Sequence, residues 1–162
     1  MPSNIYMQYD GGSIKGSATA EGYKDWITLS SLEFGVGRDV SMETGDSMNR
    51  ARNMPLFEKI KVTKETDKSS KSLLSEAVMG GGKVVKINIV EPREQGKAQP
   101  YVEYELKNCV ISNYTQSSDG DQPTEDIELS YTAIEVNFTT FDEAGNQADK
   151  GGITYDIAKA KV

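Results

Sequence analysis

The chain has 162 residues, 36% of them hydrophobic and 27% charged, which is typical of one globular domain with its own core. Its net charge of −7 argues against a nucleic-acid partner, because binding a polyanion requires a clustered basic face. The chain contains no histidine, which removes the commonest general base, the commonest metal ligand and every histidine-activated nucleophile.

The start of the chain and its single cysteine bear on where the protein folds. Cys109 has no second cysteine to pair with, so the sequence gives no sign of oxidative folding. Residues 1–6 lack the charged and apolar segments of a signal peptide, and no apolar run is long enough to span a membrane. We therefore expect a protein that folds in the cytoplasm, inserts into no membrane and, if secreted, needs no cleaved signal.

Apolar residues alternate with polar residues along most of the chain, which predicts β-strands. Residues 5–9 form the first strand, with Ile5, Met7 and Tyr9 on one side, and a turn follows at residues 10–13. Further strands are expected over residues 56–64, 83–90, 101–114 and 153–158. The inward-facing residues expected in the strand at 101–114 are Val102, Tyr104, Leu106 and Val110.

The alternation changes phase at two places. The first shift falls at Ser30–Ser31, and the second lies close to Ala133–Ile134. The apolar residues around the shifts are Ile27, Leu29, Leu32, Phe34 and Val36 at the first, and Ile127, Leu129, Tyr131, Val136 and Phe138 at the second. A β-bulge keeps both apolar sets on the core side and bends the strand. Such strands predict a mainly β fold, with two packed antiparallel sheets forming a β-barrel-like sandwich in one domain, residues 1–162.

One segment, residues 69–79, has helical spacing and predicts a short α-helix over the end of the β-structure. Its apolar residues are Leu73, Leu74, Ala77 and Val78. Ser69 or Ser70 can cap its start, and Gly80–Gly82 can end it through a left-handed residue. Phosphate-binding glycines precede a helix whereas these follow one, so we interpret them as a helix stop.

No group of residues has the spacing of a catalytic or metal site. Asp119–Gly120–Asp121, with Glu125 and Asp126 nearby, does not match a calcium-binding loop and is interpreted as a solvated acidic turn. Four glutamates alternate with apolar residues, as outward-facing strand residues do, rather than facing each other across a cleft as in a glycosidase. They are Glu103, Glu105, Glu128 and Glu135.

Cys109 lies beside Val110 in an apolar strand and is interpreted as a small buried hydrophobe, not a nucleophile. Taken with the absence of histidine, these patterns predict that the protein is not an enzyme and carries no metal and no cofactor.

Two segments have no periodicity, residues 40–53 and residues 116–124. The first is long for a connection inside a compact domain, so we expect it to be mobile or to be ordered by something outside the subunit. Its methionines could pack adaptably on a neighbour, and its arginines could meet an acidic surface. We therefore predict a self-assembly loop whose contact residues are Met42, Met48, Arg50 and Arg52.

Several stretches occur in an order and spacing that resemble one family. Near the start they are residues 5–11, 14–17 and 26–29, and in the middle residues 62–70 with 73–74. Towards the end they are residues 123–125, 129–136 and 153–157. The middle stretch is the most specific, because a strand there runs into the expected helix and Gly80–Gly82 follows at the matching distance. The chain resembles the haemolysin-coregulated protein (Hcp) family, the tube subunits of bacterial type VI secretion systems.

The resemblance implies hexameric rings that stack into a hollow tube. A contractile sheath expels such a tube together with a spike of valine-glycine-repeat protein, and its lumen can hold effectors. The chain departs from the family pattern at Gly12–Ser13, a small insertion, at Lys71, where proline is frequent, and in residues 40–53, which are not strongly glycine-rich. These departures bear on loop contacts more than on the fold.

Two other functions stay open on the sequence alone. A tail-tube protein of a contractile phage or phage-like particle shares the same architecture. A monomeric β-sandwich binding module, for carbohydrate for example, would need an exposed aromatic platform, whereas the lone Trp26 lies in the apolar pattern of a strand.

Overall fold

The computed structural model describes residues 4–38, 54–91 and 99–162. The predicted assembly residues Met42, Met48, Arg50 and Arg52 lie outside the described residues, so their role stays a prediction. In chain order the elements are β1 (Ile5–Tyr9), the 3-10 helix η1 (Asp10–Gly12), β2 (Ile27–Leu29), β3 (Ser31–Glu33), β4 (Val36–Gly37), β5 (Leu56–Phe57), β6 (Ile60–Glu65), α1 (Ser70–Met79), β7 (Lys83–Glu91), β8 (Gln99–Ser117), β9 (Thr124–Ser130), β10 (Ala133–Phe141) and β11 (Gln147–Asp156).

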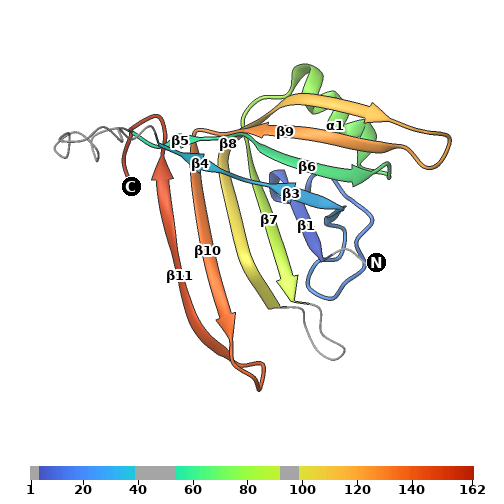
Figure 1. Ribbon diagram of the computed structural model, residues 1–162. Coiled ribbons are helices and arrows are strands. Elements are labelled where there is room, and N and C mark those ends of the chain that lie inside the picture. Colours follow the sequence, from blue (N-terminus) through green and yellow to red (C-terminus); the bar gives the residue numbers. More distant parts are fainter. Residues whose placement is uncertain (1–3, 39–53, 92–98) are drawn as a thin grey trace.

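The strands form two antiparallel layers that are joined through the long strand β8 (Figure 1). The first half of β8 lies between β7 and β10, and its second half pairs with β9. One layer therefore has the order β2-β1-β7-β8-β10-β11, and the other has the order β8-β9-β6-β3. Strands β4 and β5 form a separate small sheet. The predicted fold of two packed antiparallel sheets with a short α-helix is confirmed.

The core lies between the two layers, and both supply it with alternate residues of their strands. Met7, Ile87 and Leu106 come from the first layer, and Val62 and Leu129 come from the second; all are essentially inaccessible to solvent. Burying each such side chain contributes about 1.5–3 kcal/mol relative to leaving it in water. The period-two pattern of the sequence therefore corresponds to the two inner faces of a sandwich.

At both predicted phase shifts the chain passes from one layer to the other. Ser30 separates β2, which pairs with β1, from β3, which pairs with β6. Residues 131–132 separate β9, in the second layer, from β10, in the first. The side that faces the core changes parity at each corner because the neighbouring strands change there.

A third corner was not predicted, and it lies within β8. The expected inward set placed Val110 with Tyr104 and Leu106, but Cys109 and Ile111 are the buried residues and Val110 is only partly buried. The pairing register with β7 shifts just before Cys109, and Asn108 adopts a left-handed conformation with φ of 51°. The prediction for Val110 was wrong because this extra residue moves the buried positions that follow it to Cys109 and Ile111.

Helix α1 begins and ends as predicted, but its details differ. Only Leu73 is buried, whereas Leu74 and Val78, which belong to the same predicted apolar spacing, are exposed. Neither Ser69 nor Ser70 caps the helix through its side chain; Asp67 instead accepts the backbone N–H of Ser69 at 2.9 Å.

The end of α1 also differs from the expected left-handed stop. Gly80 is extended, with φ of −74° and ψ of 148°. Glycine is required there for space, because a Cβ atom would lie 2.6 Å from the carbonyl oxygen of Glu76. The glycine run therefore ends the helix by permitting a close approach rather than by supplying positive φ.

Candidate assembly surfaces

An apolar groove lies between the small β4–β5 sheet and the inner face of β10 and β11, with a volume of about 370 Å³. One wall comes from the small sheet and the segments beside it, and the other from β10, β11 and the chain end. The lining residues are Phe34, Val36, Pro55, Phe57, Ile134, Val136, Phe138, Ile153, Tyr155 and Val162. We call this surface the apolar groove.

Aromatic side chains pack against one another along the groove. Phe57 stacks on Tyr155 with ring centroids 4.8 Å apart, and Phe34 lies edge-on to Tyr104 at 5.5 Å. Such pairs add about 0.5–1.5 kcal/mol each to the burial of their surface. The groove is therefore a preformed feature with a fixed shape.

The outer part of the groove is open to solvent. Phe138 and Ile153 are each 53% exposed, although both lie at positions whose neighbours in the same strand, Val136 and Tyr155, are buried. The second layer does not extend over β10 and β11, as Figure 1 shows at the end where β11 lies. A contiguous exposed apolar surface of this kind is typical of a protein–protein interface.

Strand β11 forms the edge of the first layer next to the groove. Nine of its ten residues pair with β10, and no described strand pairs with its other side, where only Asp156 is bridged, to Lys161. Such an edge presents backbone N–H and C=O groups to any neighbouring strand.

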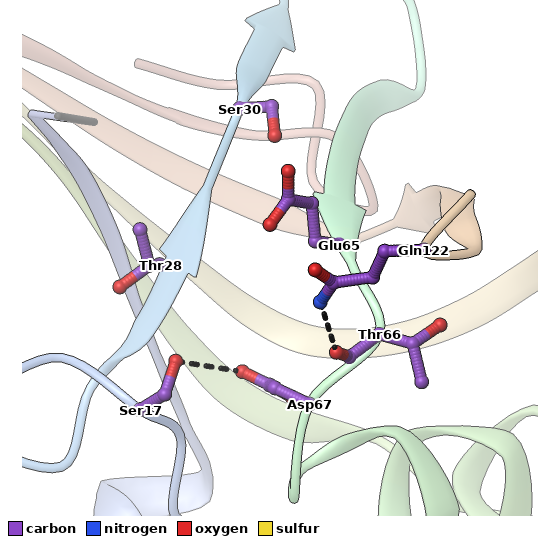
Figure 2. Close-up of a pocket in the computed structure, with 7 residues that line it drawn as sticks. All are labelled: Ser17, Thr28, Ser30, Glu65, Thr66, Asp67 and Gln122. Carbon is purple, nitrogen blue, oxygen red and sulfur yellow. Dashed lines mark hydrogen bonds between the residues drawn. The ribbon is translucent and has the colours of Figure 1, made fainter. Parts of the chain in front are cut away.

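A smaller, polar hollow of about 240 Å³ lies where β2, the end of β6 and the β8–β9 connection meet (Figure 2). Ser17 Oγ donates to Asp67 Oδ2 at 3.2 Å, and Gln122 Nε2 donates to the carbonyl of Thr66 at 3.0 Å. Thr28, Ser30 and Glu65 complete the lining. Its hydroxyl and carboxylate groups have no imidazole to activate them, so the hollow ties three segments together and offers no nucleophile.

A buried ion pair, which Asp67 connects to that hollow, joins β6, β9 and the start of α1. Lys64 and Glu125 are both fully buried and face each other across the β6–β9 pair, with Lys64 Nζ 3.3 Å from Glu125 Oε1. Ser70 and Tyr114 donate to the two oxygens of Glu125 at 2.6 and 2.7 Å, and Lys64 also contacts Asp67 at 3.1 Å. Every charge is therefore paired and hydrogen-bonded, as buried charges must be.

These contacts shift the acidity of the two carboxyl groups. Burial alone would raise the pKa of both Asp67 and Glu125. Two effects lower these pKa values: hydrogen bonds, from Ser69 to Asp67 and from Ser70 and Tyr114 to Glu125, and the positive charge of Lys64. Together they outweigh the effect of burial, so both pKa values lie below normal. The pair is therefore charged at neutral pH and serves the fold.

The structure corrects one of the interpreted sites. Asp119 and Asp121 are exposed, as expected of a solvated turn, but Glu125 belongs to the buried ion pair. The sequence contained an indication of this buried pair. Lys64 alternates in phase with the core residues of β6, and Glu125 alternates in phase with the core residues of β9. Within the described residues, no cluster of acidic, cysteine or histidine side chains could hold a metal ion.

The remaining interpretations are placed as follows. Glu103, Glu105, Glu128 and Glu135 are partly exposed strand residues. Cys109 is fully buried, and burial raises the pKa of its thiol to about 12, so it is not a reactive thiolate. No helix in the described part of the chain is long and apolar enough to cross a membrane.

The apolar groove could not have been found from sequence. The alternation predicts correctly that Phe138 and Val36 lie on the apolar side of their strands. The alternation does not show how far the second layer extends. It therefore cannot show which of the apolar residues the second layer leaves exposed.

Comparison with known proteins agrees with the architecture. The family model described as "Type VI secretion system effector, Hcp" matches residues 6–138. No curated protein matches the chain in sequence.

Solved structures of the same system superpose over almost the whole chain. A structure described as a type six secretion system protein has 23% identity and a TM-score of 0.86, covering 97% of each chain. Hcp1 from Salmonella typhimurium has 16% identity and a TM-score of 0.73, covering 99% of each chain. A type VI secretion system effector from Yersinia pestis has 18% identity and a TM-score of 0.71, covering 94% of this chain and 98% of its own.

At these identities the structures establish the fold, whereas the family model establishes the family. The chain belongs to the Hcp family of type VI secretion systems and is a non-enzymatic structural component of the secretion tube.

Proposed function

We propose that copies of this chain, as a single domain over residues 1–162, close into hexameric rings that stack into a hollow tube. The observation that supports ring formation is the apolar groove beside the edge of β11 on which no further described strand lies. Membership of a family of tube components supports the ring and tube as the form of assembly.

A closed ring requires two different surfaces on each subunit that fit one another, joined by a rotation that closes. The groove and the edge of β11 lie together at one end of the subunit, so they can form one of these two surfaces. In a ring each groove is covered by the next subunit, and the exposed apolar side chains Phe138 and Ile153 leave water.

Stacking of rings requires a further contact, for which residues 40–53 are the proposed source. They connect β4 to β5 and include Met42, Met48, Arg50 and Arg52. We expect that deleting residues 44–49 leaves the fold and the rings intact and abolishes tubes. Tubes of unchanged length in electron micrographs would contradict this role.

The family also supports the proposed partners. A contractile sheath would surround the tube, a spike of valine-glycine-repeat protein would sit at its tip, and effectors would occupy the lumen. The protein would then reside in the cytoplasm before firing and outside the cell afterwards, without a cleaved signal peptide.

The proposal is tested by the mass and shape of the purified protein. Size-exclusion chromatography with light scattering should give six times the subunit mass of 17.8 kDa, and negative-stain images should show rings with a central hole. A monomer at high concentration would overturn the proposal and favour a monomeric binding module.

A further inference from the structure

A second exposed apolar surface lies on helix α1. Leu74 and Val78 are one helical turn apart on the same face, and Met79 follows at the end of the helix. Their side chains are 48%, 73% and 79% exposed. We call these three residues the α1 ridge. A lone exposed apolar residue needs no explanation, but three on the last two turns of one short helix form a continuous surface.

The α1 ridge has no partner among the described residues of its own subunit. Helix α1 packs on β8 through the buried side of Leu73, and the ridge points away from that contact. The apolar groove lies elsewhere, between β4–β5 and β10–β11. Figure 1 shows α1 behind β8 and β9, at the other end of the molecule from β11.

The two surfaces have complementary shapes. The groove is concave, so two grooves placed face to face would enclose a void, which close-packed interfaces avoid. The ridge is the outer face of a ten-residue helix, about 15 Å long, and it is convex. An amphipathic helix laid into an apolar groove is a recurrent mode of protein recognition.

We propose that the α1 ridge of one subunit docks into the apolar groove of the next subunit in the ring. This inference rests on the proposed ring, because it names the two surfaces that meet there. The partner is a second copy, since the proposed ring is built from copies of one chain and the groove lies beside the edge of β11 on which no further described strand lies. A ridge and a groove at opposite ends make a heterologous contact, which is the type that generates rings.

The native chain suits cysteine cross-linking, because its only cysteine, Cys109, is fully buried. Val78→Cys and Ile153→Cys would each place one thiol on an exposed position, the first on the ridge and the second in the groove. The two variants would carry different affinity tags, be expressed together, and be treated with a short bismaleimide. Met79→Cys with Phe138→Cys provides a second ridge–groove pair, in case one pair is poorly aligned.

Docking predicts a covalent dimer that carries both tags when a ridge variant and a groove variant are combined. Each variant alone should give no dimer, because its single thiol faces an unsubstituted neighbour. A chain with both Val78→Cys and Ile153→Cys should give a ladder of products that ends at six subunits.

Two results would overturn the docking. One is the absence of a mixed dimer for both pairs although all four thiols react with a monofunctional maleimide. The other is a dimer formed by Ile153→Cys alone, which would indicate groove-to-groove contact.

Imaging of the same samples separates this inference from the proposed function. Rings without mixed cross-links would reject the ridge–groove contact and retain the ring. A mixed dimer in samples that never form rings would support the contact and reject the ring.

Discussion

Lys64 and Glu125 illustrate what the buried polar residues of this protein do. Both are fully buried and each has several partners from different segments, including Ser70 at the start of α1 and Tyr114 on β8. A buried ion pair contributes little compared with a well-packed apolar pair of the same shape. Removing one partner is much more costly, since the remaining charge is left buried and unpaired.

Lys64→Met should therefore lower the free energy of unfolding by about 3–5 kcal/mol, because it leaves Glu125 without a counter-charge. Adding Glu125→Leu to the same chain should recover most of that loss. Lys61→Met, at an exposed position of the same strand, is the matched control and should change stability by less than about 0.5 kcal/mol. Urea unfolding of the four proteins measures the differences, and a double variant as unstable as Lys64→Met would contradict the argument.

The lowered pKa values of Asp67 and Glu125 make stability depend on pH in a definite direction. Because the folded values lie below the unfolded ones, the unfolded chain binds more protons as acid is added. The stabilisation is complete above the unfolded values, about pH 4–4.5, and is lost as pH falls through the folded values. In urea unfolding between about pH 5 and 3, the free energy of unfolding of Asp67→Asn should therefore fall less steeply than that of the wild type. The control Asp121→Asn, in an exposed turn, should show the same dependence of the free energy of unfolding on pH as the wild type.

At the scale of secondary structure, most strands could be predicted because apolar and polar residues alternate according to which side of a strand is buried. Both predicted phase shifts proved to be corners between the layers. The corner in β8 was not predicted because Lys107 and Asn108 are both polar, so they do not indicate which side of the strand is buried. In addition, Val110 is apolar although its side of the strand is only partly buried. An asparagine inside a predicted strand was the remaining signal, since asparagine tolerates the left-handed conformation.

The exposed face of α1 was also missed, for a different reason. Apolar spacing shows that Leu73, Leu74, Ala77 and Val78 can share a stripe, but not how much of that stripe the sheets cover. Only Leu73 is fully buried, and Ala77 packs partly buried against the core. When an apolar face is divided between the subunit interior and a neighbour, the sequence pattern is the same for both parts.

The glycines after α1 permit a direct test of how the helix ends. Gly80→Ala should destabilise the protein by about 1–3 kcal/mol, since the new Cβ would lie 2.6 Å from a backbone oxygen that cannot move away easily. Gly81→Ala is the control, because nothing lies within 4 Å of its Cβ position and its φ is not left-handed. It should be neutral or raise stability by about 0.4–1 kcal/mol through the unfolded state. Equal losses for both variants in thermal unfolding would contradict a steric role for Gly80.

At the scale of the whole molecule, the apolar groove should separate folding from assembly. Ile153→Asp removes apolar contact and places a carboxylate where a neighbouring subunit would bury it, at a cost of roughly 3 kcal/mol or more per contact. This corresponds to at least about 100-fold weaker association. Because Ile153 is half exposed in the subunit, the unfolding of the monomer itself should change little.

Val84→Asp provides the comparison, since Val84 is also exposed but lies on β7, outside both the apolar groove and the α1 ridge. Light scattering should show a shift from ring to monomer for Ile153→Asp and the unchanged ring mass for Val84→Asp. Loss of the ring in both variants would indicate a general effect of added charge instead of a groove contact.

Strand β8 has a mechanical consequence for a component of a secretion tube. Its 19 residues have a contour length of about 60 Å, and it is hydrogen-bonded along both halves, to β7 and β10 and then to β9. A force along this strand would have to shear many ladder bonds at the same time, whereas a force across a sheet edge would open them one after another. Each half of β8 therefore resists force along its own direction, and the edge strand β11 is where the subunit would peel first unless a neighbour is bonded to it.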